Sequence, residues 1–329
     1  MSTTRAIAHN TAIHLGGKII SILLGFVAFG LMARYLGTEQ FGWYTSVIAF
    51  LQFIGIVTDF GMTPVTAQMM SEPRFDKPTL LRNLLTFRLV TAVIAFALAP
   101  LVALFFPYPR EVLLAITFTA ISFIAMAINQ VLLGFYQTRL EMQIQAIGEI
   151  IGRLFLVAAI WLLIVFGAGF LPIMGAVAGA SVLYTAVIAL HARRVTSLAP
   201  AYDSVIWREI VKKSWPIAIA IMCNVVYLKG DIVLMQWFVS QSAIGIYGAA
   251  YRVLDVVTQS GMMLMGLLLP LLAYAWSRQD NELFRQRYQQ AFDLLMLFGI
   301  PLTVGGILLA GPIIDLVAGP EFAESAPIL

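Results

Sequence analysis

Cysteine and histidine are nearly absent from this 329-residue chain, which has one Cys and three His. Cys223 lies inside an apolar run, so the chain has no disulfide framework and no cysteine-based metal site. His9, His14 and His191 show no metal-ligand spacing. The sequence also has no nucleotide-binding motif, and we therefore expect neither a metal nor another cofactor.

Charged residues are scarce as well. They make up 11% of the chain, and 60% of its residues are hydrophobic, whereas a soluble domain carries about 25% charged residues. The net charge of +3 comes from basic residues scattered between apolar runs, which does not form the basic face of a nucleic-acid-binding protein. The composition excludes an ordinary globular protein and a nucleic acid partner.

Long apolar runs separated by short polar breaks are the main pattern of the sequence. A membrane-spanning helix needs about 20 mostly apolar residues, and this requirement predicts an all-α, polytopic membrane bundle with nine complete spans and the start of a tenth. The predicted spans are residues 12–35, 41–69, 80–106, 111–138, 142–167, 169–191, 211–239, 243–275 and 287–310.

Lys and Arg in the short loops predict the orientation, because these residues are retained on the cytoplasmic side. The N-terminal tail and every second loop carry nearly all of them, and the opposite loops offer essentially Arg110. We expect a multi-pass protein of the bacterial inner membrane with a cytoplasmic N-terminus. The residues that carry the bias are Arg5, Arg74, Lys77, Arg82, Arg139, Arg193, Arg194, Arg208, Lys212, Lys213, Arg278, Arg285 and Arg287.

An internal repeat emerges when the chain is shifted by 203 positions, which aligns Tyr35 with Phe238, Gly42 with Gly245, and Tyr44 with Tyr247. Six spans separate the copies, so both have the same orientation, as in transporters with two parallel repeats. We expect a six-helix N-terminal lobe at 1–195, a cytoplasmic linker at 196–210 and a C-terminal lobe at 211–329.

The second copy would need to reach roughly residue 400 to match the first. We therefore expect a C-terminal lobe of three spans plus the start of a fourth, a chain that is incomplete at its C-terminus, and a fragment that does not transport.

Four motifs stand out along the chain: Met32-Ala33-Arg34-Tyr35-Leu36-Gly37 within the run Lys18 to Gly42, Asp59-Phe60-Gly61, Asp231 with Gly245-Ile246-Tyr247 and Ala250-Tyr251-Arg252, and Gly319-Pro320-Glu321-Phe322. Together they resemble the polysaccharide transporter branch of the multidrug/oligosaccharidyl-lipid/polysaccharide exporter superfamily.

The resemblance implies a protein of twelve to fourteen spans in two lobes. It also implies translocation of an undecaprenyl-diphosphate-linked oligosaccharide, such as an O-antigen or exopolysaccharide unit, by alternating access. The partners implied are this lipid-linked substrate, membrane lipid, a glycan polymerase and a chain-length regulator.

Ionisable side chains within the predicted spans point to a polar interior. At roughly 3 kcal/mol each near a helix centre, exposing all of them to lipid would cost about 30 kcal/mol, so they face protein or a wet cavity. These residues are Lys18, Asp59, Arg88, Glu149, Arg153, Lys229, Asp231, Arg252, Asp255 and Asp293.

The basic members of this set are the candidate substrate ligands, because Lys and Arg complement phosphate. They are Lys18, Arg88, Arg153, Lys229 and Arg252; Asp59, Glu149, Asp231 and Asp255 are candidate acidic partners or ion-coupling groups.

Internal salt bridging is the alternative role for these charges. Helical depth suggests that Lys18 pairs with Asp59 and that Arg88 snorkels towards the cytoplasm. It also divides the charges into two layers, with Lys229, Asp231, Arg252 and Asp255 in the outer half of the membrane.

Two other functions remain open. One is a cation-coupled multidrug exporter of the same superfamily. An acidic residue in the outer half of the first span would favour this function, and none is present. A membrane-embedded glycan polymerase or ligase would need a sizeable outer loop, but every predicted outer loop is short. A flippase makes and breaks no bond, so we expect a non-enzyme driven by an ion gradient, the membrane potential or the substrate gradient.

Overall fold

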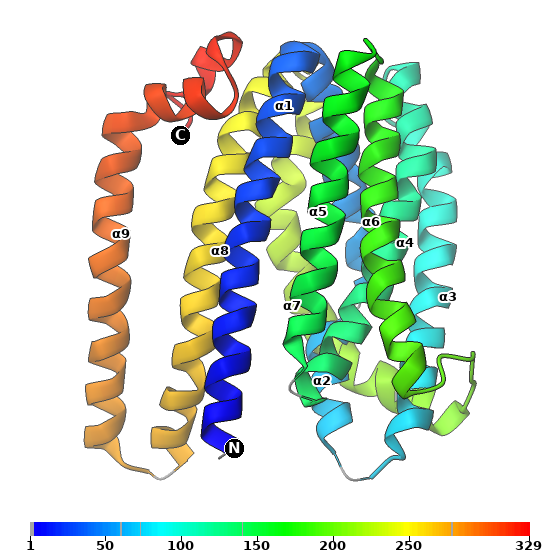
Figure 1. Cartoon of the computed structure of the whole chain (residues 1–329), viewed down its shortest axis with the longest axis vertical. Coiled ribbons are helices and arrows are strands. Elements are labelled where there is room, and N and C mark those ends of the chain that lie inside the picture. The colour runs from blue at the N-terminus through cyan, green and yellow to red at the C-terminus, as the bar shows by residue number, and fades with distance from the viewer. Residues whose placement is uncertain (1–2, 60, 73, 140, 278) are drawn as a thin grey trace. The chain divides into compact units, whose positions relative to one another are not determined.

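The chain folds into α-helices joined by short connections (Figure 1). The computed structural model describes residues 3–59, 61–72, 74–139, 141–277 and 279–329, and these ranges contain no β-strand. The predicted all-α class is confirmed. The helices are α1 (Thr3–Asp59), α2 (Met62–Ser71), α3 (Lys77–Ala103), α4 (Arg110–Arg139), α5 (Met142–Val165), α6 (Phe170–Val195), α7 (Ser204–Met235), α8 (Gln241–Ser277), α9 (Asn281–Val317) and the 3-10 helix η1 (Pro320–Ser325).

The helices form two compact units, residues 1–245 and 246–329. The first contains α1 to α7 and the first turn of α8; the second contains the rest of α8, α9 and η1. Within the predicted linker 196–210, only residues before Ser204 are non-helical. The second half of that linker is helical, because Asp203 accepts hydrogen bonds from the amides of Val205 and Ile206 and so starts α7 at Ser204.

Seven helical segments in the described part of the chain are long and apolar enough to cross a membrane. One of them, Gly16–Gly55, has 40 residues, twice what one span needs. Gly37 divides it, because its φ of 67° lies in the left-handed region that glycine tolerates. The first two predicted spans therefore meet at Gly37 inside α1.

The predicted span 41–69 is not continuous. α1 ends at Asp59 and α2 begins at Met62, with Gly61 between them at a φ of 71°. A Cβ atom on Gly61 would lie 2.9 Å from the carbonyl oxygen of Ser214 on α7. Glycine is therefore required here by both its backbone angle and its close packing.

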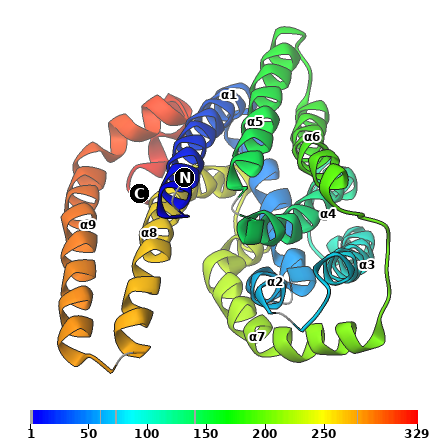
Figure 2. The same ribbon diagram turned by 60° about the horizontal axis from the view of Figure 1, so that its bottom comes forward.

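Apolar packing fixes the end of the first unit around α2 (Figure 2). The buried cluster comes from α2, α3, α4, the last turns of α6 and the start of α7, and it consists of Met62, Val65, Met69, Met70, Leu80, Leu81, Leu84, Leu85, Phe87, Val131, Leu132, Phe135, Tyr136, Ile188, Ala192, Ile206 and Ile210.

Hydrogen bonds hold the α6–α7 connection against α3. Arg82 donates to the carbonyl of Ala199 at 2.9 Å, and Asn83 accepts from the amide of Asp203 at 2.7 Å. At the start of α3, Asp76 accepts from the hydroxyl and the amide of Thr79, which holds the pKa of the Asp76 carboxyl below its usual value. These contacts order the polar connections on this end of the unit.

The two glycines aligned by the internal repeat lie against each other in the first unit. A Cβ on Gly42 would lie 1.8 Å from the carbonyl oxygen of Gln241, and a Cβ on Gly245 would lie 2.0 Å from that of Thr38. Thr38 and Gln241 are themselves 203 residues apart. The contact is thus reciprocal, as two copies around a pseudo-two-fold axis require.

Side-chain hydrogen bonds surround this glycine crossing. Ser242 donates to Thr38 at 2.8 Å, and Gln236 donates to Ser46 at 2.7 Å. Gln241 donates to the Gln236 side-chain oxygen at 2.9 Å. Interhelical hydrogen bonds beside small residues are the usual means of joining helices in lipid.

We expect Gly42→Ala to destabilise the protein by about 1–3 kcal/mol, because the added methyl group forces two backbones apart. Thermal unfolding of the purified protein in detergent measures the effect. Gly175→Ala on α6 is the control, since a Cβ there meets no atom within 4 Å. Equal stability of the two variants would contradict the close crossing.

Candidate functional site

A cavity of about 350 Å³ opens within the first unit, between α1, α3, α4 and α7. One part of its wall is apolar and includes Phe96 and Phe123. The polar part of the wall consists of Gln52, Thr58, Asp59, Arg88, Gln130 and Lys229. Among the described lining residues, the cations exceed the acids by one.

Arg88 is the most deeply buried of these charges, with 2% of its side chain exposed. One terminal nitrogen donates to Oδ1 of Asp59 at 2.9 Å. The guanidinium also donates to the backbone carbonyl of Thr58 and to the side-chain oxygen of Gln130. The expectation that Arg88 snorkels to the membrane surface is wrong, because these acceptors hold it inside the bundle.

The acceptors of Arg88 exist because the helix breaks there. The last carbonyls of a helix have no partner within it, and α1 ends at Asp59. In lipid such groups must be satisfied by protein or by a wet cavity. Arg88 caps this end, where the negative pole of the helix and the Asp59 carboxylate both favour a cation.

Lys229 lines the same cavity as Asp59 and Arg88. The predicted separation of Asp59 and Lys229 into two layers is therefore wrong. The predicted depth of Lys229 follows from a seventh span at 211–239, but the first turns of α7 cross the end of the unit in Figure 2. This brings Lys229 level with residues predicted near the inner surface.

Lys18 lies in a second polar cluster, between α1 and α5. Its Nζ contacts the two carboxylate oxygens of Glu149 at 3.1 and 3.4 Å, and Ser21 donates to the same carboxylate at 2.7 Å. The predicted Lys18–Asp59 pair is wrong, because each has a different partner in the structure. Helical depth placed both at similar heights but does not reveal which neighbouring helix faces each side chain.

Arg153 lies one turn after Glu149 on α5 and approaches α1. A Cβ on Gly25 would be 3.8 Å from the central carbon of its guanidinium. Gly25 thus leaves room for this cation beside the first helix. The predicted placement of Glu149 and Arg153 on one face of the helix agrees with their shared approach to α1.

The other predicted site residues lie elsewhere. Asp231 on α7 accepts a hydrogen bond from the amide of Ile232 at 2.8 Å. Arg252 and Asp255 lie on α8 in the second unit, three residues apart and partly exposed. Asp293, predicted as an interfacial residue, accepts from Gln289 on the exposed surface of α9.

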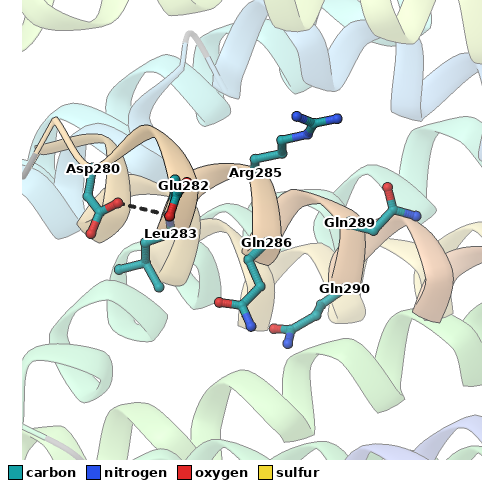
Figure 3. Close-up of a pocket in the computed structure, with 7 residues that line it drawn as sticks. All are labelled: Asp280, Glu282, Leu283, Arg285, Gln286, Gln289 and Gln290. Carbon is teal, nitrogen blue, oxygen red and sulfur yellow. Dashed lines mark hydrogen bonds between the residues drawn. The ribbon is translucent and has the colours of Figure 1, made fainter.

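A second, open hollow lies along the start of α9, lined by Asp280, Glu282, Leu283, Arg285, Gln286, Gln289 and Gln290. Figure 3 shows that these side chains fan out from a single helix instead of converging on a common point. The Asp280 carboxylate is engaged, since it accepts from the amide of Leu283 at 2.9 Å. The hollow is the polar start of a helix and not a candidate site.

Sequence reasoning missed the neutral polar residues of both clusters. Gln130 follows Asn129 inside an apolar span, and that polar pair is a sequence signal from which the cavity could have been predicted. Ser21 and Thr58 gave no comparable signal, because a hydroxyl in a membrane helix usually bonds to its own backbone.

Comparison with known proteins places the fold and the family. The sequence matches the family described as "Polysaccharide biosynthesis protein" over residues 31–327. It is 25% identical over 100 residues to the teichuronic acid biosynthesis protein TuaB of Bacillus subtilis (strain 168), covering 30% of this chain and 20% of that protein. The chain thus spans about a fifth of the length of this relative.

Solved structures of similar fold are membrane transporters. An inward-facing multidrug resistance MATE family transporter of the MOP superfamily has a TM-score of 0.64 and 12% identity, covering 96% of this chain and 78% of that chain. A MOP superfamily transporter from Pyrococcus furiosus Vc1 (DSM3638), described as having a binding pocket of reverse polarity, has a TM-score of 0.58 and 14% identity, with coverages of 98% and 75%.

The fold is therefore that of a multi-pass membrane protein, similar to the folds of these solved transporters. By its sequence, the chain belongs to the polysaccharide biosynthesis protein family, whose model matches most of its length. The resemblance found from the sequence motifs is confirmed.

We expect Arg88→Gln to cost about 3–5 kcal/mol of stability, because it leaves the Asp59 carboxylate buried without its cation. The double variant D59N/R88Q should recover part of this loss. Denaturant unfolding in detergent measures both variants.

Arg139→Gln is the matched control. Its ion pair with Glu141 is 3.1 Å long but partly exposed, and such pairs contribute about 0–1 kcal/mol. A loss for Arg88→Gln no larger than that for Arg139→Gln would contradict the buried capping role.

Proposed function

We propose that this protein moves an undecaprenyl-diphosphate-linked oligosaccharide across the bacterial inner membrane for surface polysaccharide synthesis. The observation that carries the proposal is the cavity with Arg88 and Lys229 in a member of the polysaccharide biosynthesis family. The headgroup passes through the polar interior and the prenyl tail stays in lipid. No bond is made or broken, so the protein is not an enzyme.

The chemistry of the cavity suits a diphosphate. Arg presents a planar fork of donors to phosphate oxygens, and Lys supplies a point charge. The volume of about 350 Å³ lies at the low end of small-molecule sites, so the cavity accommodates the diphosphate end of the headgroup. The Phe96 and Phe123 rings provide an apolar wall on which sugar or isoprenoid carbon can pack.

The other predicted cations extend the path of the headgroup. Lys18 and Arg153 flank the first helix, and Arg252 lies on α8. We propose that these residues contact the diphosphate at other stages of transport, with Asp59, Glu149, Asp231 and Asp255 as their acidic partners or as ion-coupling groups.

The proposed mechanism is alternating access between lobes at 1–195 and 211–329, joined by the linker 196–210. The reciprocal Gly42 and Gly245 contact supports this arrangement of repeats. The same proposal includes a cytoplasmic N-terminus. It also includes a glycan polymerase and a chain-length regulator as functional partners.

Cation-coupled multidrug export is the second candidate, because a similar structure is described as a multidrug resistance transporter. A site for cationic drugs requires an excess of acidic groups. The described cavity lining has one acid and two bases, which favours an anionic substrate.

Deleting the gene from its native strain should abolish surface glycan and cause lipid-linked oligosaccharide to accumulate inside the cell. Complementation with a Lys229→Gln variant should lower export at least tenfold, because a charge-assisted hydrogen bond contributes about 1.5–3 kcal/mol. Extracted glycan and lipid-linked intermediates are quantified by mass spectrometry at matched protein levels.

Arg110→Gln is the control, since Arg110 is the exposed first residue of α4 and does not line the cavity. Unchanged surface glycan after deletion would refute the proposed function. Normal export by Lys229→Gln would refute only the role of this cavity.

A further inference from the structure

The first turns of α7 form an amphipathic helix at one end of the first unit. In Figure 2 this segment, residues 204–215, runs across the end of the bundle before the rest of α7 enters it. Ile206 and Ile210 are buried, and the Trp207 ring packs edge-to-face on Phe87 with centroids 5.0 Å apart. One face of the helix is therefore fixed to the protein.

The opposite face is neither purely polar nor purely apolar. Val205, Trp215 and Val211 are 60%, 53% and 42% exposed, and Arg208 and Lys212 lie between them. The spacing of three or four residues places all five on one side of the helix. We name this face the α7 strip. Mixed cations, aliphatic residues and tryptophan are typical of a helix at a membrane surface.

The cations of the α7 strip have no partner within the described part of the chain. Three other basic residues at this end are engaged: Lys213 with Glu72 at 2.6 Å, Arg74 with Glu209 at 3.6 Å, and Arg82 with backbone carbonyls. Arg208 and Lys212 have no hydrogen bond or ion pair among the described residues, and neither do Arg193 and Arg194 at the end of α6.

The nearest acids do not neutralise the α7 strip. Asp203 caps the start of α7 through two backbone amides. Glu209 lies within 4.0 Å of both Arg74 and Lys213. The strip thus presents to its surroundings two cations that have no partner among the described residues.

We propose that the α7 strip docks on the headgroups of anionic phospholipids in the adjacent leaflet. Arg208 and Lys212 contact the lipid phosphates, and Trp215 and the two valines enter the boundary between headgroups and acyl chains. Each basic residue near an anionic membrane surface adds about fivefold to the attraction. This site is separate from the cavity and does not depend on the proposed transport function.

The exposed apolar groups favour lipid over an acidic protein or nucleic acid. Two valines and a tryptophan on a charged face remain costly in water but are stabilised at the acyl boundary. The segment also forms the N-terminal end of α7, a helix that is long and apolar enough to cross a membrane.

Trp215 offers a local readout of lipid contact. The protein is reconstituted in phosphatidylcholine vesicles containing brominated phosphatidylglycerol or brominated phosphatidylcholine, and the Trp215 signal is the fluorescence difference between wild type and Trp215→Phe. We expect brominated phosphatidylglycerol to quench Trp215 at a severalfold lower mole fraction than the neutral lipid. R208Q/K212Q should abolish that preference, because each charge removed weakens the attraction by up to about fivefold, and high salt should weaken it in the wild type.

Lys77→Gln is the matched control, because Lys77 is exposed at the start of α3 on the same end of the unit. It should keep the wild-type preference. Equal quenching by the two lipids, absence of quenching by either, or an unchanged preference in R208Q/K212Q would each overturn the proposal. If added polyglutamate changed the Trp215 fluorescence signal and phosphatidylglycerol did not, the strip would instead bind an acidic polypeptide.

Discussion

The capping of a broken membrane helix by Arg88 is the interaction on which the candidate site depends. A break inside a membrane span frees carbonyl groups that lipid cannot satisfy. Arg88 contacts the Thr58 carbonyl and the Asp59 carboxylate at that break, and it is almost fully buried there. The same residue thus satisfies the backbone, neutralises the acid and supplies a cation to the cavity wall. A Lys in its place would reach one acceptor well but lacks the planar fork that reaches several.

The break itself depends on close packing against α7. Gly61 turns the chain through a left-handed conformation and lies directly on the backbone of α7 near Ser214 and Ala218. That stretch of α7 contains Pro216, which removes one helical hydrogen bond. Two irregular segments therefore meet where the cavity begins. Irregular backbone at membrane depth is tolerated where it is buried in protein or lines a polar space, and both conditions hold here.

The parts of the fold that follow from local pattern were predictable, and the pairing of charges was not. Runs of apolar residues predict the spans, and the cost of charges in lipid points to Lys18, Asp59, Arg88, Glu149 and Lys229, which lie in the two polar clusters. The partners of those residues depend on which helix faces which, and this is determined by the turn at Gly37 and the break at Gly61. Both glycines lie inside apolar runs, where hydropathy alone does not distinguish a turn from a packing contact. The sequence therefore predicts a pair between Lys18 and Asp59, although Lys18 pairs with Glu149, on a helix far away in the sequence. Arg88 illustrates the same limit, because its depth suggested snorkelling while its acceptors arise only from the break.

The second half of α1 explains how a polar cavity persists in a mainly apolar bundle. Gly42 packs against the start of α8, and Gly61, just beyond the end of α1, packs against α7. These two contacts are about 30 Å apart along the helix axis, which is close to the thickness of the hydrocarbon core. The helix is thus held by backbone contact at two separate points, while Gln52, Thr58 and Asp59 between them face the cavity. Because glycine contacts leave no side chain to rearrange, they fix the helix without filling the space beside it. The packing of the backbone thus positions the charged groups that face the cavity.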